Sequence, residues 1–258
     1  MDDADPADFY VGIVVDVYAA LRGSVPDPDR YHAFIARSGE PALELGCGDG
    51  DPLLTLREAG LDVEGLDSSA DMLAKLESTA SRQGIDVTVH HSTIQTMDLR
   101  RRYKSIFLAG PTFNLLPDDL AASRALERIA AHLEADGSAL IPLFVPAPVS
   151  ERHLGRVREH VEDGGRSLRV TATATERDEL ARTQTTTLRY EVSDGDNVMS
   201  VEKPWLLHWY TQSGFSELAT AAGLGIVAIV GRDGRPASPD AHELAFLLRT
   251  AQDELISR

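Results

Sequence analysis

The stretch PALELGCGDGDPLL, residues 41–54, places three glycines and the single cysteine of the chain between two apolar runs. A short apolar run that leads into a glycine-rich turn is typical of a buried β-strand followed by a helix. Glycine is needed where the backbone takes a positive φ, or where a ligand approaches the main chain closely. The stretch therefore predicts a strand, a tight turn and a helix, with a ligand site at the turn.

The same alternation continues on the C-terminal side of the turn. Short apolar runs predict strands at residues 42–45, 62–66, 86–89, 105–109 and 139–145, and helical patterns occupy residues 53–59, 70–82 and 118–133. Strands that alternate with helices, joined by right-handed crossovers, form a parallel sheet covered on both faces. We therefore expect an α/β fold with a doubly wound, mostly parallel sheet.

The pattern changes after residue 149. We expect a helix over residues 150–163, and then a threonine-rich region up to residue 210 whose alternating residues predict three antiparallel strands. The core pattern returns with a helix at 211–222 and strands at 225–230 and 242–248. The chain thus divides into an N-terminal helical lid (1–40), a cofactor-binding core (41–149), an inserted antiparallel sheet or substrate cap (150–210) and a completion of the core (211–258).

Composition limits the partners of the protein. The 258 residues, of which 43% are hydrophobic, suffice for one large α/β domain. A formal net charge of −16 disfavours nucleic acid and anionic membranes as partners. We see neither a signal-peptide pattern nor an apolar run near the roughly 20 residues of a membrane span, and one cysteine cannot form an internal disulfide. We therefore expect a cytoplasmic enzyme.

The spacing of the glycines, GxGxG, distinguishes between possible ligands. A phosphate loop of the Walker type needs a lysine after its glycines, and none follows here. A dinucleotide fingerprint has its third glycine one residue later, and Glu44, Asp49 and Asp51 surround this turn with negative charge. A ligand with an ammonium or sulfonium group suits such a turn better than a pyrophosphate. A nicotinamide-dependent oxidoreductase remains the alternative.

Asp67 ends the next expected strand, in VEGLDSS. A carboxylate at this position of a nucleotide-binding fold accepts hydrogen bonds from the hydroxyls of a ribose. The alternative is that Asp67 caps the helix that begins near Ala70. Because the glycine-rich turn lies upstream at the appropriate distance, we favour the ribose role.

Taken together, LELGCGDG, VEGLDSSADMLAKL, FLAGPTFNLL and HLEADGSALIPLF resemble the class I S-adenosylmethionine-dependent methyltransferases. The resemblance is closest to the small-molecule branch with the sugar N-methyltransferases and the glycine and sarcosine N-methyltransferase-like enzymes. It implies a seven-stranded Rossmann-like sheet whose last strand is antiparallel, S-adenosyl-L-methionine as the cofactor, and methylation of N or O of a small molecule such as a specialised metabolite. It also implies that the insertion after the fifth strand covers the active site or forms a homodimer interface. A methyltransferase-like protein that binds the cofactor without turnover is a further alternative.

The resemblance also assigns residues to cofactor binding. The glycines would hold the methionine part, with Glu44 beneath them, and Asp67 the ribose. The carboxylate that the family often has after the third strand is absent, which leaves Ser92 or Thr93 for the adenine. The full set is Tyr18, Glu44, Gly46, Gly48, Gly50, Asp67, Ser68, Met72, Ser92, Thr93, Ile94, Ala109 and Gly110.

Methyl transfer from a sulfonium requires mainly that acceptor, methyl group and sulfur are aligned in a dry site, so a general base is optional. His208 is the candidate base, with Tyr210 and Asn114 as further catalytic candidates. Substrate contacts are expected from Thr112, Phe113, Trp205 and Trp209, although packing or turn formation would also account for these residue types. No metal site is expected, because the adjacent His90 and His91 would point to opposite faces of a strand.

Overall fold

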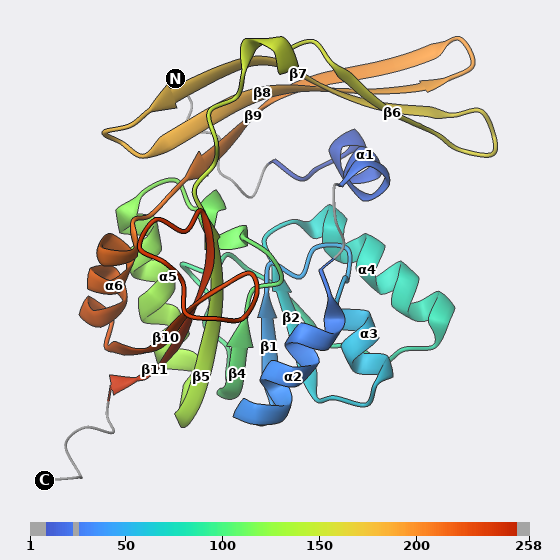
Figure 1. Cartoon of the computed structure of the whole chain (residues 1–258). Coiled ribbons are helices and arrows are strands. Elements are labelled where there is room, and N and C mark those ends of the chain that lie inside the picture. The colour runs from blue at the N-terminus through green and yellow to red at the C-terminus, as the bar shows by residue number, and fades with distance from the viewer. Residues whose placement is uncertain (1–8, 23–25, 252–258) are drawn as a thin grey trace, which may run out of the picture.

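A computed structural model describes residues 9–22 and 26–251, and it contains two β-sheets (Figure 1). We call the seven-stranded sheet the core sheet and the four-stranded sheet the cap sheet. In Figure 1 the cap sheet lies above one end of the core sheet, and helix α1 (Ile13–Leu21) lies between the two.

The core sheet has the strand order β10-β11-β5-β4-β1-β2-β3. The pairs β1 with β2, β1 with β4, β2 with β3, and β4 with β5 are parallel, whereas β11 runs antiparallel to both β5 and β10. The prediction of a doubly wound, mostly parallel sheet is confirmed. Its strands are β1 (Ala42–Leu45), β2 (Val63–Asp67), β3 (Val89–His91), β4 (Tyr103–Phe107), β5 (Leu133–Phe144), β10 (Leu224–Gly231) and β11 (Glu243–Thr250).

Helices cover both faces of this sheet. On one face α2 (Pro28–Ser38), α3 (Leu53–Glu58) and α4 (Ala70–Gln83) bury apolar side chains against the strands. On the other face α5 (Asp119–His132) and α6 (Gln212–Ala221) do the same. Because the central strands are buried on both sides, they occur in the sequence as continuous apolar runs.

The cap sheet is formed by β6 (Val157–Val161), β7 (Ser167–Asp178), β8 (Thr183–Asp194) and β9 (Asn197–His208), all antiparallel in that order. It has four strands where the sequence predicted three.

The prediction of a helix over residues 150–163 is wrong. The short 3₁₀ helix η3 (Glu151–His153) is followed by strand β6 instead. The reason is the turn at Gly164 and Gly165, where the N–H of Gly165 donates to the carbonyl of Glu162 at 2.8 Å. This turn folds residues 157–161 back beside β7, so their backbone groups pair across a hairpin and not within a helix.

Helix α1 packs against the cap sheet through Val14 and Val17, which contact Leu168, Val170 and Tyr190. Its last turn leads to Arg22, whose guanidinium lies 3.0 Å from an Asp49 carboxylate oxygen and also contacts Asp51. The helix is thereby tied to the cap sheet on one side and to the glycine-rich turn on the other. Residues 1–8 and 23–25 of the expected N-terminal lid lie outside the described residues. Within the ranges that the structure describes, no helix is long and apolar enough to cross a bilayer.

Candidate active site

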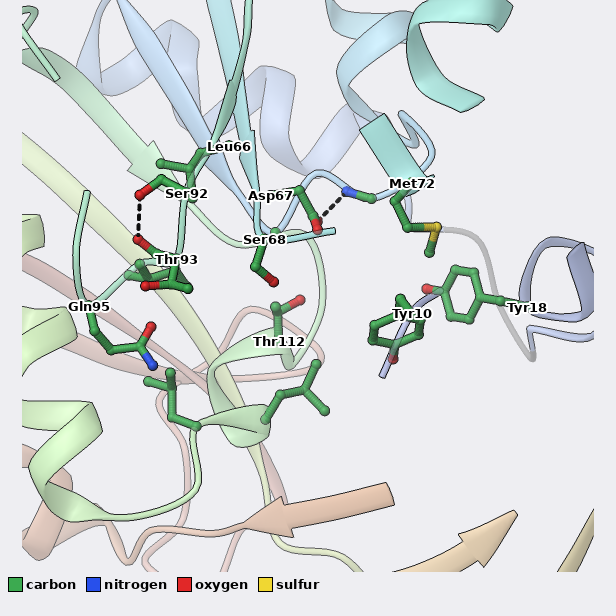
Figure 2. Close-up of a pocket in the computed structure, with 15 residues that line it drawn as sticks. Tyr10, Tyr18, Leu66, Asp67, Ser68, Met72, Ser92, Thr93, Gln95 and Thr112 are labelled. Carbon is green, nitrogen blue, oxygen red and sulfur yellow. Dashed lines mark hydrogen bonds between the residues drawn. The ribbon is translucent and has the colours of Figure 1, made fainter. Parts of the chain in front are cut away.

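A cavity of about 760 Å³, its open mouth included, lies at the carboxyl ends of the core strands and under the N-terminal segment (Figure 2). The carboxyl ends of parallel strands are where α/β proteins bind ligands. The residues that line it are Tyr10, Tyr18, Gly46, Gly48, Leu66, Asp67, Ser68, Met72, Ser92, Thr93, Ile94, Gln95, Thr112, Leu115 and Leu116.

The glycine-rich turn forms one wall of this cavity. Gly46 and Gly48 have φ values of 72° and 52°, which other residues rarely adopt. A Cβ atom at Gly46 would lie 2.5 Å from the methyl group of Thr112, so only glycine leaves room there. Gly50 also has a positive φ, of 105°, but it packs against Leu54 and Leu76 and does not line the cavity. The turn therefore presents bare backbone to a ligand.

Asp67 lies next to this turn, at the end of β2. Its carboxylate accepts hydrogen bonds of 2.8 Å from the backbone N–H groups of Gly48 and Ser69 (Figure 2). Burial raises the pKa of Asp67, and the hydrogen bonds from Ser69 and Gly48 oppose that rise. The carboxylate is thus fixed in position with further lone pairs available to a ligand.

Glu44 lies under the turn and does not line the cavity. Its side chain is fully buried, and neither carboxylate oxygen has a hydrogen-bond partner in the described part of the chain. Burial, followed by repulsion from Asp67 and Asp51, raises the pKa of Glu44 well above its usual value. Burial and the neighbouring carboxylates thus disfavour a negative charge on Glu44 beneath the turn.

The segment after β3 forms the opposite end of the cavity. The hydroxyl of Ser92 donates to the carbonyl of Thr93 at 3.2 Å, and the hydroxyls of Thr93 and Thr96 lie 2.7 Å apart. Ile94 lines the cavity as expected. Gln95 also lines it, a residue that the sequence did not single out, although it is the longest polar side chain of this segment.

Two tyrosines from the N-terminal segment close the cavity. The rings of Tyr10 and Tyr18 lie edge to face with centroids 5.3 Å apart. The hydroxyl of Ser69 donates to the carbonyl of Tyr10 at 2.5 Å, and the side chain of Trp205 lies beside the Tyr10 hydroxyl. Burial raises the pKa of both tyrosines, so both remain protonated at neutral pH. The expected Tyr18 is therefore joined in the lining by Tyr10, which is not in the set assigned from the sequence.

The expected base, His208, is not among the residues that line the cavity. Its side chain is 2% exposed, and its Nε2 lies 3.6 Å from an Asp119 carboxylate oxygen and 3.4 Å from an Arg182 nitrogen. Burial lowers the pKa of His208. Its ring contacts that of Tyr210, with centroids 4.6 Å apart, and burial raises the pKa of Tyr210. These two candidates form a cluster with Asp119 and Arg182 outside the cavity.

Asn114 is fully buried and its carboxamide is engaged by backbone groups. Its Nδ2 donates to the carbonyls of Phe144 and His208 at 3.0 and 2.8 Å, and its Oδ1 accepts from the N–H of Phe144 at 3.1 Å. It belongs to the 3₁₀ helix η2 (Thr112–Leu115). Asn114 therefore joins η2 to the ends of β5 and β9.

The four residues expected to contact the substrate do not lie together in the structure. Thr112 lines the cavity, whereas Phe113 packs in the core against Tyr210 and Phe215. Trp205 does not line the cavity, but it lies beside Tyr10, which does. Trp209 is buried with the guanidinium of Arg177 4.0 Å from its ring centroid.

The remaining expected positions bring no further group into the cavity. Ala109 and Gly110 are not among its lining residues. No group of three or more metal-ligating side chains occurs in the ranges 9–22 and 26–251.

Comparisons with known proteins agree with this geometry. Residues 42–137 match the family model of a methyltransferase domain. A dTDP-3-amino-3,6-dideoxy-alpha-D-glucopyranose N,N-dimethyltransferase of Streptomyces fradiae is 27% identical over 238 residues, with 88% of this chain and 90% of that protein covered.

Similar solved structures include the CcbJ methyltransferase from Streptomyces caelestis, with a TM-score of 0.73, 23% identity and coverage of 92% of this chain and 96% of that one. A sugar N-methyltransferase from a Streptoalloteichus species has a TM-score of 0.72 at 20% identity, with 93% and 94% covered. With a glycine-rich turn that only glycine fits and a carboxylate fixed beside it, the cavity suits a nucleoside with a cationic amino-acid tail. Residues 42–137 form a methyltransferase domain, and the protein is an S-adenosylmethionine-dependent methyltransferase.

Proposed function

We propose that this enzyme methylates the amine nitrogen of a small molecule, and that the acceptor is an amino sugar of a specialised metabolite. The observation that carries the proposal is the extent of the match to the Streptomyces fradiae N,N-dimethyltransferase. Because the match covers 88% of this chain, it continues beyond residues 42–137 into the cap sheet. The same comparisons lend the nicotinamide-dependent oxidoreductase no support.

We further propose how the cofactor lies in the cavity. Its methionine part would lie along Gly46 and Gly48, under Tyr18, and its ribose hydroxyls would bond to Asp67. Its adenine would then extend toward the segment after β3. In support, Figure 2 shows Asp67 between the tyrosine end of the cavity and the end formed by Ser92, Thr93 and Gln95. When bound, the cofactor supplies an activated methyl group on a good leaving group.

The lining residues favour catalysis without a dedicated base. The ionisable side chains of the described lining are Tyr10, Tyr18 and Asp67. The raised pKa values of the tyrosines make them hydrogen-bond donors at neutral pH, and Asp67 is engaged by Gly48 and Ser69. The acceptor would therefore bind as the free amine, a form that a dry site favours because desolvation lowers the pKa of an amine. The rate would then come from alignment and exclusion of water.

The cluster behind η2 would shape the acceptor side from outside. We propose that Asn114 and His208 hold η2 against β5 and β9, so that Thr112, Leu115 and Leu116 face the cavity. Phe113, Tyr210 and Trp209 would support the same wall by packing. In this arrangement these residues position the acceptor site without contact with the reacting atoms.

The test is a two-step assay. Calorimetry first measures binding of S-adenosylhomocysteine, and mass spectrometry then follows methylation of nucleotide-linked amino sugars, free amino sugars, small amino acids and hydroxy analogues of the sugars. We expect one or two methyl groups on an amino sugar and none on its hydroxy analogue. Methylation of only the hydroxy compounds would contradict the proposal, and binding without any product would favour the non-catalytic reading.

A further inference from the structure

The end of the cavity after β3 lacks a carboxylate. The chain has Ser92, Thr93, Ile94 and Gln95 there, and Asp98 is the first acidic residue beyond them. The hydroxyls of Ser92 and Thr93 are already engaged, the first with the carbonyl of Thr93 and the second with the hydroxyl of Thr96. The donor of Ser92 is therefore used within the segment, and its hydroxyl can offer a ligand acceptor capacity alone.

Gln95 differs from these neighbours. Its side chain is half-buried and ends inside the cavity, with the carboxamide directed away from the β3 segment (Figure 2). Among the residues that the structure describes, none forms a hydrogen bond with this carboxamide. The carboxamide is open to water in the cavity, and a ligand that displaces this water favours binding only if it satisfies both the donor and the acceptor of the carboxamide.

We propose that the Gln95 carboxamide recognises the adenine of the cofactor at the edge formed by N6 and N1. The proposal rests on the proposed placement of the cofactor, which directs the base toward this segment. Adenine presents there a donor, the N6 amino group, beside an acceptor, the ring nitrogen. A carboxamide offers the complementary acceptor and donor, and pairs of this kind are the usual way in which glutamine and asparagine read adenine.

The chemistry of the carboxamide has a consequence that a carboxylate would not have. Hypoxanthine reverses the pattern, because it has a carbonyl acceptor at position 6 and an N–H donor at position 1. A carboxamide satisfies this reversed pattern by turning half a revolution about its last bond. A carboxylate only accepts, so it would leave one acceptor of either base without a donor, N1 of adenine or the carbonyl of hypoxanthine. Gln95 should therefore accept both bases.

The experiment measures the dissociation constants of S-adenosylhomocysteine and S-inosylhomocysteine by calorimetry. The proteins are the full chain, Gln95→Glu, Gln95→Leu, and Gln83→Glu, which makes the same chemical change at the exposed end of α4. We expect the unaltered chain and Gln83→Glu to bind both ligands within about tenfold of each other. Gln95→Leu should bind both ligands roughly tenfold or more weakly, and Gln95→Glu should also weaken both, because a carboxylate satisfies only the donor of either base.

Two outcomes would overturn the inference. One is a preference of the unaltered chain for one of the two ligands by much more than about tenfold, and the other is unweakened adenosyl binding by Gln95→Leu or Gln95→Glu. If thermal unfolding shows that Gln95→Leu fails to fold, the binding constants of Gln95→Glu alone test the inference. Failure of the cofactor placement is distinguishable, because the unaltered chain would then bind S-adenosylhomocysteine without any effect of Asp67→Ala.

Discussion

The carboxylate of Asp67 accepts a 2.8 Å hydrogen bond from the backbone N–H of Gly48, which ties the end of β2 to the glycine-rich turn after β1. The two segments are already neighbours, because the N–H groups of Gly46 and Cys47 donate to the carbonyl of Leu66 at 2.7 and 3.0 Å. The carboxylate thus stands where the turn and the next strand meet. A ligand that binds the turn is within reach of Asp67 without rearrangement of the site.

Asp67→Ala should weaken binding of S-adenosylhomocysteine by roughly tenfold or more, because it removes a charged acceptor and leaves the Gly48 N–H without its partner. Calorimetry measures the effect. Asp71→Ala is the control, since Asp71 accepts from the N–H of Gly12 at the surface of the same region. An unchanged dissociation constant for Asp67→Ala would show that the carboxylate does not contact the cofactor.

The core sheet and the glycine-rich turn could be predicted because their signals are local. Each central strand is buried on both faces and appears as an apolar run. Gly46 directly follows β1, and Asp67 ends β2. Parallel strands bring such ends together at one edge, so two separate marks in the sequence indicate one site. The cofactor and the enzyme class came from the resemblance of the stretches that contain these marks to the S-adenosylmethionine-dependent methyltransferases.

The acceptor side depended on packing that no local pattern records. In the 3₁₀ helix η2, Thr112 and Leu115 are three residues apart and share the face toward the cavity, which leaves Phe113 and Asn114 toward the core. The residue types of Thr112–Leu115 do not indicate which of these side chains face the cavity and which face the core. His208 lies outside the cavity for a similar reason, because the direction of its side chain is set by the pairing of β9 with β8 and by α5.

Asn114→Ala should lower the free energy of unfolding by about 2–4 kcal/mol, because three backbone groups lose a buried partner at once. Urea unfolding measures this change. Asn197→Ala, in the exposed turn between β8 and β9, is the matched control and should be nearly neutral. A loss for Asn114→Ala as small as that of the control would mean that η2 is held by packing alone.

His208→Gln should change kcat by less than about tenfold and leave the shape of the pH–rate profile as it is, since the imidazole lies outside the cavity. Removal of a general base would instead cost roughly 10²–10⁴ in rate and abolish the corresponding limb of the profile. Initial rates across pH, with a methyl acceptor identified by the panel assay, separate the two cases. A drop of that larger size without loss of cofactor binding would make His208 a catalytic residue.

The ionisation of Glu64, a residue of β2, makes the free energy of unfolding depend on pH. Burial opposes its ionisation, but hydrogen bonds from His90, Arg101 and Tyr103 outweigh burial and hold the pKa of Glu64 below its usual value. A carboxyl group with a depressed pKa stabilises the fold above its unfolded pKa, near 4.3, and the contribution is lost as pH falls through the folded pKa.

Glu64→Gln should therefore be less stable than the unaltered chain at pH 7, with a difference that narrows as the pH falls below about 4. Thermal unfolding across pH measures this difference. The control is Glu58→Gln, which changes an exposed glutamate at the end of α3. If the difference between Glu64→Gln and the unaltered chain stays constant from pH 7 to the acid limb, the network around Glu64 contributes through packing and not through its charge.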